Sequence, residues 1–304
     1  MNYWNQDFER QHNTQPARDS ERSQQTLDQE KSSLSGIAEA PIGVFDSGVG
    51  GLTILSALRE ELPNENYIYF GDSANCPYGM RSDAEIIELS IRACSFLVNQ
   101  GVKLIVVACN TASQAALNSL RATFPSIRFV GVVPAVKPAA RATKKGRIGI
   151  AATNQAARAI YLQQLIEDFA GGIQAFAVGC PELVTLVERG DIDGLVVEET
   201  VKQALDPILK EDVDVIVLGC THFPALRPVI ERVTQNKIHI IDSSNAVARR
   251  THYVLDTEGL IQPDNSNTTH FGNLNVWCSG DAAVFRNVAL KLLGYDVNVQ
   301  QATV

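Results

Sequence analysis

The chain has 304 residues, of which 45% are hydrophobic, and a formal net charge of −8 at pH 7. This length allows two domains with their own hydrophobic cores, at roughly 150 residues each, and the negative charge argues against a general nucleic-acid-binding surface. No apolar stretch approaches the ~20 residues of a membrane span, and the N-terminus lacks the apolar segment of a signal peptide. We therefore expect a cytoplasmic enzyme that binds neither nucleic acid nor membrane.

Residues 1–40 are rich in Gln, Ser, Asp, Glu and Arg, and their few apolar side chains follow no period. This composition predicts a disordered N-terminal arm. A segment added for expression, or one that orders on a partner, is the alternative.

From Pro41 onward, short apolar runs alternate with longer helical patterns. The expected strands are 42–45, 67–70, 104–108, 129–133, 148–151, 175–178, 213–218, 238–241 and 275–278, and the expected helices include 52–62, 84–99, 112–123, 156–169 and 245–256. This alternation predicts an α/β fold with parallel sheets covered by helices on both faces. The number of strands favours two similar parallel-sheet α/β domains that face each other across an active-site cleft.

Pro134 marks the expected junction, because a proline stops a strand and can open the next helix. We expect a first α/β domain over 41–134, a second over 135–242, and completion of the first by 243–304. The pattern alone does not fix which sheet takes the last strand, near Trp277.

Two cysteines, Cys109 and Cys220, lie in near-duplicate settings at the ends of apolar runs, each followed by an amide or hydroxyl side chain. In an open α/β sheet this place is the carboxyl end of a strand, where ligands bind. Inversion of a carbon centre by proton transfer needs one group on each face of that carbon. A thiol can serve on either face, since a helix N-terminus can lower its reference pKa of about 8.5. The pair therefore predicts two bases acting on one substrate.

The other cysteines carry no such signal. The six cysteines of the chain form no Cys-x-x-Cys pair, so we expect reduced thiols and no metal site. Cys76, Cys94 and Cys278 are interpreted as packed residues.

Three further segments carry polar groups suited to a site. The turn Asp46-Ser47-Gly48-Val49-Gly50-Gly51 can point amides at an anion, although it matches neither a dinucleotide nor a nucleoside triphosphate motif. Its Asp46 either handles a proton or caps the turn. Tyr78, in Pro77-Tyr78-Gly79, is expected to present its amide and phenol to the cleft, and His222 to polarise Cys220 or protonate a leaving group.

Together and in order, four motifs resemble the motif set of the glutamate racemase family within the aspartate/glutamate racemase superfamily. They are the turn at Asp46–Gly51, Pro77-Tyr78-Gly79, Cys109-Asn110-Thr111-Ala112 and Gly219-Cys220-Thr221-His222-Phe223-Pro224. The likeness runs from about Ile42 to Arg250, and the stretch 131–139 resembles the form found in γ-proteobacterial members.

This resemblance implies cofactor-independent interconversion of L- and D-glutamate, which would supply D-glutamate for peptidoglycan and so for the cell wall and cell shape. It makes Cys109 and Cys220 the two bases, assisted by Asp46 and His222, with Glu188 as an acid behind them. The implied substrate-binding residues are Asp46, Ser47, Pro77, Tyr78, Gly79, Asn110, Thr111, Thr153, Thr221 and His222. Activation by a peptidoglycan precursor and a homodimer are further expectations.

One departure concerns substrate contacts. Family members often show Thr-x-x-Thr after the strand at Ile148, whereas this chain has Thr153-Asn154-Gln155-Ala156. A hydroxyl group near the substrate is therefore missing or supplied from elsewhere.

Three alternatives remain at this point. The first is an aspartate racemase or another amino-acid racemase of the same superfamily. The second is a pyridoxal phosphate enzyme with Lys137 as its Schiff-base lysine, but no phosphate-binding motif accompanies that residue. The third is a non-catalytic amino-acid-binding protein whose two domains close on a ligand, although binding alone does not call for a thiol on each domain.

Overall fold

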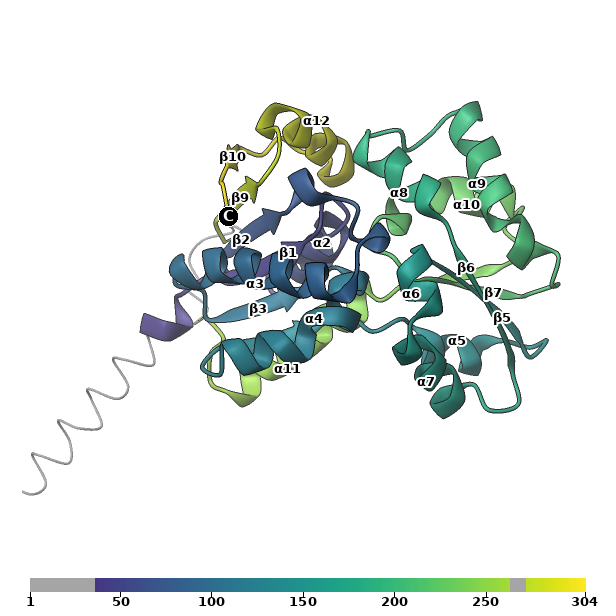
Figure 1. The fold of residues 1–304 in the computed structure, drawn as a ribbon, viewed down its shortest axis with the longest axis horizontal. Coiled ribbons are helices and arrows are strands. Elements are labelled where there is room, and N and C mark those ends of the chain that lie inside the picture. Colours follow the sequence, from purple (N-terminus) through teal and green to yellow (C-terminus); the bar gives the residue numbers. More distant parts are fainter. Residues whose placement is uncertain (1–35, 263–271) are drawn as a thin grey trace, which may run out of the picture.

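The computed structural model describes residues 36–262 and 272–304. Within these ranges the strands form two separate sheets, and each strand runs parallel to its neighbours (Figure 1). The expected α/β fold with two parallel sheets is confirmed.

The first sheet has the strand order β10-β9-β2-β1-β3-β4. Its strands are β1 (Ile42–Asp46), β2 (Tyr67–Gly71), β3 (Leu104–Val107), β4 (Arg128–Gly131), β9 (Leu274–Cys278) and β10 (Val299–Gln301). The end of the chain returns to this sheet, because β9 pairs with β2. Strand β10 was not predicted, since its Gln300 and Gln301 are exposed polar residues that give no apolar run.

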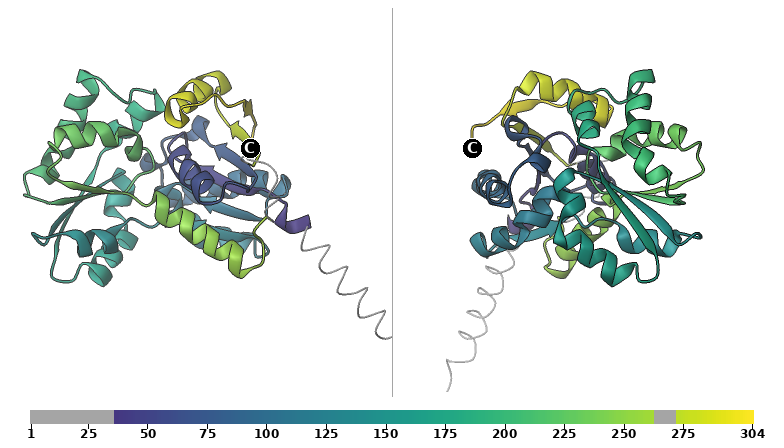
Figure 2. Two further views of the ribbon diagram at one scale, coloured as in Figure 1. Left: turned by 180° about the vertical axis from the view of Figure 1, so that it is seen from behind. Right: turned by 45° about the vertical axis from the view of Figure 1, so that its right-hand side comes forward.

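Helices cover both faces of the first sheet (Figures 1 and 2). Helices α3 (Asp83–Asn99) and α4 (Asn110–Thr123) pack together on one face, and α2 (Leu52–Glu61), α11 (Ser244–Thr257) and α12 (Ala282–Leu293) lie on the other. Successive side chains of a strand point to opposite faces, so Val107 joins the hydrophobic cluster under α3 and α4 whereas Val106 joins the cluster under α2. Burial on both faces explains the unbroken apolar sequence of such strands.

The second sheet has the order β6-β5-β7-β8 and the same two-sided construction. Its strands are β5 (Arg147–Ala152), β6 (Gln174–Gly179), β7 (Val215–Leu218) and β8 (His239–Ile241). Helices α5 (Val136–Ala142) and α7 (Ile160–Phe169) cover one face, and α8 (Pro181–Glu188), α9 (Leu195–Leu209) and α10 (Arg227–Val233) cover the other.

The single helix expected over 156–169 is two helices, α6 (Asn154–Arg158) and α7. Ala159 separates them with an extended backbone, at φ −66° and ψ 136°. The two parts have different packing partners, since α6 contacts α4 of the first sheet and α7 contacts α5 of the second. This division depends on tertiary contacts, so the local sequence, which has no Gly or Pro there, did not indicate it.

The strand orders place both cysteines at equivalent points. In each sheet the order reverses next to the first strand, so that β1 lies beside β3 and β5 lies beside β7. Ligands bind outside the carboxyl ends of the strands at such a reversal. Cys109 follows β3 and Cys220 follows β7, and thus each thiol stands at the reversal point of its own sheet.

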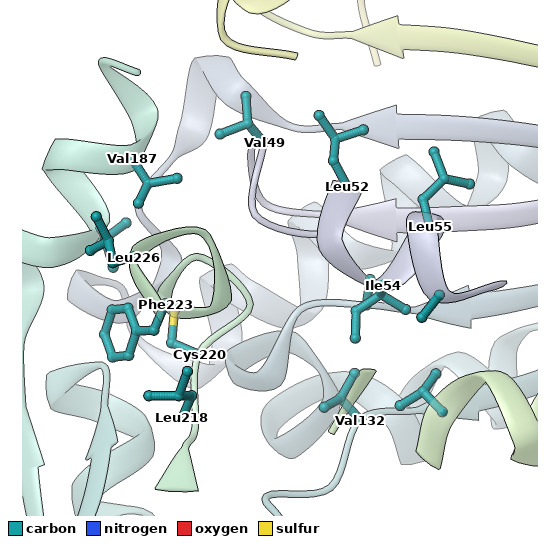
Figure 3. Close-up of a cluster of buried hydrophobic side chains, with 14 of the residues drawn as sticks. Val49, Leu52, Ile54, Leu55, Val132, Val187, Leu218, Cys220, Phe223 and Leu226 are labelled. Carbon is teal, nitrogen blue, oxygen red and sulfur yellow. The ribbon is translucent and has the colours of Figure 1, made fainter. Parts of the chain in front are cut away.

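One hydrophobic cluster runs across the junction between the sheets. Figure 3 shows Val49 and Leu52, from the turn after β1 and the start of α2, on one side, and Val187 of α8 and Phe223 after β7 on the other. All four side chains are buried. The carboxyl ends of the two sheets are therefore joined through a shared core as well as through the chain.

The chain passes between the sheets twice, after β4 and after β8, and Ser243 Oγ at the second passage donates to Val133 O at the first over 2.7 Å. The division at residue 134 stays a prediction. Nearly all of the expected arm over 1–40 lies outside the described residues; of its last five residues, Ala38 is buried. No helix in the described ranges is both long and apolar enough to cross a membrane.

A buried ion pair, Lys103–Glu65, lies next to the first residues of β3 and β2 and can be tested by mutation. Lys103 Nζ lies 2.5 Å from Glu65 Oε2, with side-chain exposures of 0% and 2%. The amine also donates to Leu260 O, and Glu65 Oε1 accepts from Gln262 N. Residues 260–262 are thus attached to the sheet through this ion pair.

We expect Lys103→Met to destabilise the protein by about 3–5 kcal/mol, because it leaves the Glu65 carboxylate buried without its partner. The double variant Lys103→Met with Glu65→Gln should recover much of that loss. Urea unfolding measures both. The exposed pair Arg286–Asp296 is the matched control, where removal of one partner should change stability little because solvent screens the charges. Equal losses at the two pairs would contradict this account.

Candidate functional site

Cys109 sits at the start of α4, where a strand gives way to a helix. Its backbone is extended, and its Sγ accepts a hydrogen bond from Ala112 N at 3.4 Å, in the position that a capping side chain takes. The thiol donates to Ser47 Oγ over 3.5 Å, in the turn after β1. The side chain is buried.

Burial raises the pKa of Cys109 to about 12, and the Asp46 carboxylate adds to the shift. The Ala112 amide and the Ser47 hydroxyl favour the thiolate but do not compensate for the burial. The expectation that the helix N-terminus lowers this pKa is therefore wrong for the described state: Cys109 is a thiol at neutral pH.

Cys220 has a different neighbour, the imidazole of His222. Its Sγ lies 3.6 Å from His222 Nδ1, and the opposite ring nitrogen, Nε2, lies 2.5 Å from Glu188 Oε1. Cys220 and His222 are both buried. The three side chains form a row in which His222 connects the thiol to a carboxylate, as expected for Glu188 behind the thiol.

The row has a definite charge distribution. Burial opposes the imidazolium, but the Cys220 and Cys76 thiols and Glu188 raise the pKa of His222 well above its usual value. Burial likewise opposes the Glu188 carboxylate, yet His222 and the Val49 amide lower its pKa. At neutral pH the structure therefore favours an imidazolium between a carboxylate and the Cys220 sulfur.

Asp46, at the end of β1, connects the two halves of the site. Its Oδ1 accepts from Gly48 N at 2.9 Å, and its Oδ2 accepts from Thr221 Oγ1 at 3.0 Å. Complete burial raises the pKa of Asp46 to about 6, although His222 works against the shift. The residue caps its turn, as one of the two interpretations expected, and also holds Thr221, whereas a role of Asp46 in proton transfer stays a prediction.

Two glycines let the turn after β1 approach the second half. A Cβ added to Gly48 would lie 2.0 Å from Glu188 Oε1, and one added to Gly50 would lie 2.5 Å from the His222 ring. Val49 N also donates to Glu188 Oε1 at 2.9 Å. Any side chain at these two positions would therefore push His222 and Glu188 away from the turn.

Asn110 and Thr111, the first residues of α4, lie on the Cys109 side. Both are buried, and Asn110 Oδ1 has no hydrogen-bond partner. Thr111 Oγ1 lies 3.1 Å from Thr153 Oγ1 across the junction. Thr153 caps α6 by accepting from Ala156 N, and Ala156 is buried. Ala156 has no hydroxyl group, but the hydroxyls of Thr111 and Thr153 lie next to each other close to this position.

The Pro77-Tyr78-Gly79 motif does not present a free phenol to the cleft, contrary to expectation. The Tyr78 phenol donates to Asp72 Oδ2 over 2.6 Å, so this group supports the loop instead of facing the cleft as a free donor. Gly79 packs against Thr153, where a Cβ would come within 2.6 Å of the Thr153 Cβ. Pro77 precedes the short helix η2 (Tyr78–Met80).

The interpretation of Cys76 as only a packed residue is incomplete, because its thiol lies beside two residues of the site. Its Sγ lies with Glu188 and His222 in a group whose ligand atoms are all within 4.8 Å of one another. The nearby Cys76 thiol also lowers the pKa of Glu188 and raises that of His222. Its position next to Pro77-Tyr78-Gly79 was the available signal. Cys94 and Cys278 are buried core residues, as expected.

Several proteins of similar sequence or structure are glutamate racemases. A glutamate racemase from Herpetosiphon aurantiacus is 44% identical over 250 residues, which cover 82% of this chain and 96% of the relative. The structure is similar to Escherichia coli glutamate racemase in complex with L-glutamate and the activator UDP-MurNAc-ala (TM-score 0.74, 36% identity, 86% and 97% coverage). It is also similar to Francisella tularensis glutamate racemase in complex with D-glutamate (TM-score 0.75, 28% identity, 88% and 98% coverage).

The family described as Asp/Glu/Hydantoin racemase matches residues 51–251, which include Cys109, Cys220 and most of the residues around them. That range runs from the turn after β1 into α11 and so contains the whole second sheet. The chain belongs to the Asp/Glu/Hydantoin racemase family.

Proposed function

We propose that this protein is a glutamate racemase that transfers protons with Cys109 and Cys220 and needs no cofactor. The observation that carries the proposal is the placement of two buried thiols at matching strand reversals, with the hydrogen bond from Thr221 to Asp46 joining their two halves. The thiols also lie within electrostatic range, because Cys220 contributes to the raised pKa of Cys109.

The reaction requires a thiolate on one face of the substrate and a thiol on the other. The thiolate removes the proton from Cα, and the electron pair of that C–H bond remains on a planar carbanion stabilised by the adjacent carboxylate. The opposite thiol then gives its proton to the other face, which inverts the centre. Each turnover exchanges the protonation states of the two sulfurs, so the reverse reaction restores them.

The surroundings of the thiols support different resting roles. Burial keeps Cys109 protonated, whereas Cys220 faces the imidazolium of His222. In the free protein we therefore assign Cys109 as a proton donor, and Cys220, with His222 beside it, as the proton-transfer group on the opposite face. Asp46, with its pKa raised to about 6, assists by ordering the turn between them.

Polar groups near the thiols support an amino-acid substrate. Asn110 Oδ1, buried and without a partner, suits the ammonium group as a hydrogen-bond acceptor. The amides at the start of α4 suit a carboxylate, since a helix N-terminus attracts anions. Ser47, Thr111, Thr153 and Thr221 complete the proposed contacts, with Tyr78 and Gly79 as the supporting wall. The related proteins that hold L- and D-glutamate support glutamate as the substrate.

We further propose that the D-glutamate product serves peptidoglycan synthesis. The activator bound to the Escherichia coli protein, UDP-MurNAc-ala, supports activation of this chain by a peptidoglycan precursor. A homodimer and a cytoplasmic location stay predictions.

Proton NMR of the amino acid in D₂O tests the function. The α-proton signal of L-glutamate should disappear in the presence of the protein, together with formation of D-glutamate. Aspartate, offered in the same way, should exchange far more slowly. Faster exchange of aspartate would identify an aspartate racemase, and binding of glutamate without any exchange would identify an amino-acid-binding protein.

Cys109→Ala and Cys220→Ala should each lower the racemisation rate by about 10²–10⁴-fold, the usual contribution of one acid or base group. Each sulfur serves one face of the carbanion, so both directions should suffer. Coupled assays that start from L- and from D-glutamate measure this. Cys94→Ala is the matched control, because Cys94 is a buried cysteine of α3 outside the four site motifs. Near-normal rates for either catalytic variant would refute the two-base reaction.

His222→Asn should slow the direction that uses Cys220 as base more than the opposite direction, because the imidazole lies 3.6 Å from the Cys220 sulfur. Initial rates from each enantiomer give the ratio, and thermal melting reports on folding. Unchanged rates in both directions, with an unchanged melting temperature, would reduce His222 to a packing residue.

Asp46→Asn should lower activity but stabilise the fold at pH 7. The carboxyl pKa rises from 3.8 to about 6 on folding, so the native state holds this proton more tightly and stability falls as pH rises from about 4 to 6. Asparagine avoids that loss, on the order of 3 kcal/mol. Unfolding at several pH values should show the gain above pH 6 and its disappearance below pH 4. A gain independent of pH would contradict the titration of Asp46.

A further inference from the structure

Cys76, Glu188 and His222 together have the composition of a metal site. In the described part of the chain they are the one group of three such side chains whose ligand atoms approach closely, all within 4.8 Å of one another. They supply one sulfur, one carboxylate oxygen and one imidazole nitrogen. This donor set suits Zn²⁺ and similar borderline-soft divalent ions better than Mg²⁺ or Ca²⁺, which prefer oxygen ligands.

The backbone leaves room for these atoms to converge. The ideal Cβ position at Gly48 lies 2.0 Å from Glu188 Oε1 and 3.0 Å from Cys76 Sγ, so the oxygen and the sulfur meet over the same glycine. His222 Nε2 completes the group at 2.5 Å from the same oxygen. The three ligands come from the loop after β2, from the end of α8 and from the segment after β7. No sequence spacing links them, and the absence of a Cys-x-x-Cys pair could not exclude this site.

Access to the group is compatible with exchange of an ion. Cys76 is only partly buried, and the Glu188 side chain is 21% exposed, whereas His222 is 3% exposed. An ion can therefore arrive from the side of Cys76 and Glu188. A tetrahedral Zn²⁺ with bonds of about 2.1 Å needs its nitrogen and oxygen about 3.4 Å apart, so the Glu188 oxygen must move by about 1 Å from its present 2.5 Å.

We propose that this group is an inhibitory site for Zn²⁺ or a similar divalent ion. Binding forms bonds from the ion to Cys76 Sγ, Glu188 Oε1 and His222 Nε2, and it releases the thiol proton and the Nε2 proton to solvent. The ion replaces the hydrogen bond between His222 and Glu188. His222 Nε2 is then held by the ion, so the imidazole that lies 3.6 Å from Cys220 Sγ can no longer exchange a proton with Glu188, and proton transfer at Cys220 stops. Binding itself is independent of the proposed racemase function, whereas the inhibition rests on it.

Co²⁺ tests the binding, because a thiolate ligand gives cobalt a charge-transfer absorption band that needs no enzyme activity. The full-length protein should show this band, and Cys76→Ser should lose it. The double variant Cys109→Ala with Cys220→Ala should retain it, as should the control Cys94→Ala. Melting curves verify that each variant is folded. A band that persists in Cys76→Ser but disappears in the double variant would place the ion on the catalytic thiols and overturn the proposal, as would the absence of any band in the full-length protein.

Addition of Zn²⁺ tests whether metal binding inhibits racemisation. Racemisation by the full-length protein should fall on addition of ZnCl₂ and recover on addition of EDTA. In Cys76→Ser, half-inhibition should need at least about tenfold more Zn²⁺, the smaller effect expected when a metal site is disturbed, with each variant compared with its own metal-free rate. Equal sensitivity of both proteins would overturn the inhibitory site. A full-length protein with the cobalt band but no racemase activity would instead refute the proposed function and leave the metal site intact.

Discussion

The site depends on the close approach of the turn after β1 to His222 and Glu188. Gly48 and Gly50 have no side chains to hold these residues away, and Asp46 accepts a hydrogen bond from Thr221 at the start of the same turn. The shared hydrophobic cluster behind the turn keeps the two sheets at this separation. Without the approach, the imidazole would lose its carboxylate partner, and the two thiols would belong to two unconnected half-sites.

The two thiols are equivalent in the fold and unequal in their chemistry. Each follows the third strand of its sheet, but Cys109 meets a helix N-terminus, a serine and a buried carboxylate, whereas Cys220 meets an imidazolium. A symmetric reaction does not require symmetric surroundings. It requires a proton donor on one face of the substrate and a base on the other, and the two sulfurs already have different neighbours before the substrate arrives.

Most of the fold and several site residues could be predicted from the sequence, because strands with many buried residues appear as apolar runs. All nine expected strands exist, since strands covered on both faces leave unbroken apolar runs. The cysteine motifs located the reversal points, and Glu188 was found through a family resemblance. Strand β10, the break at Ala159 and the direction of the Tyr78 phenol were missed. Each is decided by a contact that the local pattern does not show: β10 pairs with the edge of β9, α6 contacts α4, and the Tyr78 phenol meets the Asp72 carboxylate on its own loop.

The pairing of β9 with β2 also affects the order in which the two sheets can be completed during synthesis. Residues 274–278 leave the ribosome after every strand of the second sheet has been made, since β8 ends at residue 241. Until then one edge of β2 has unpaired amides and carbonyls, and the first half of the chain is an incomplete sheet. The second sheet, whose strands are consecutive, can form first and so provide a folded neighbour against which the earlier half closes.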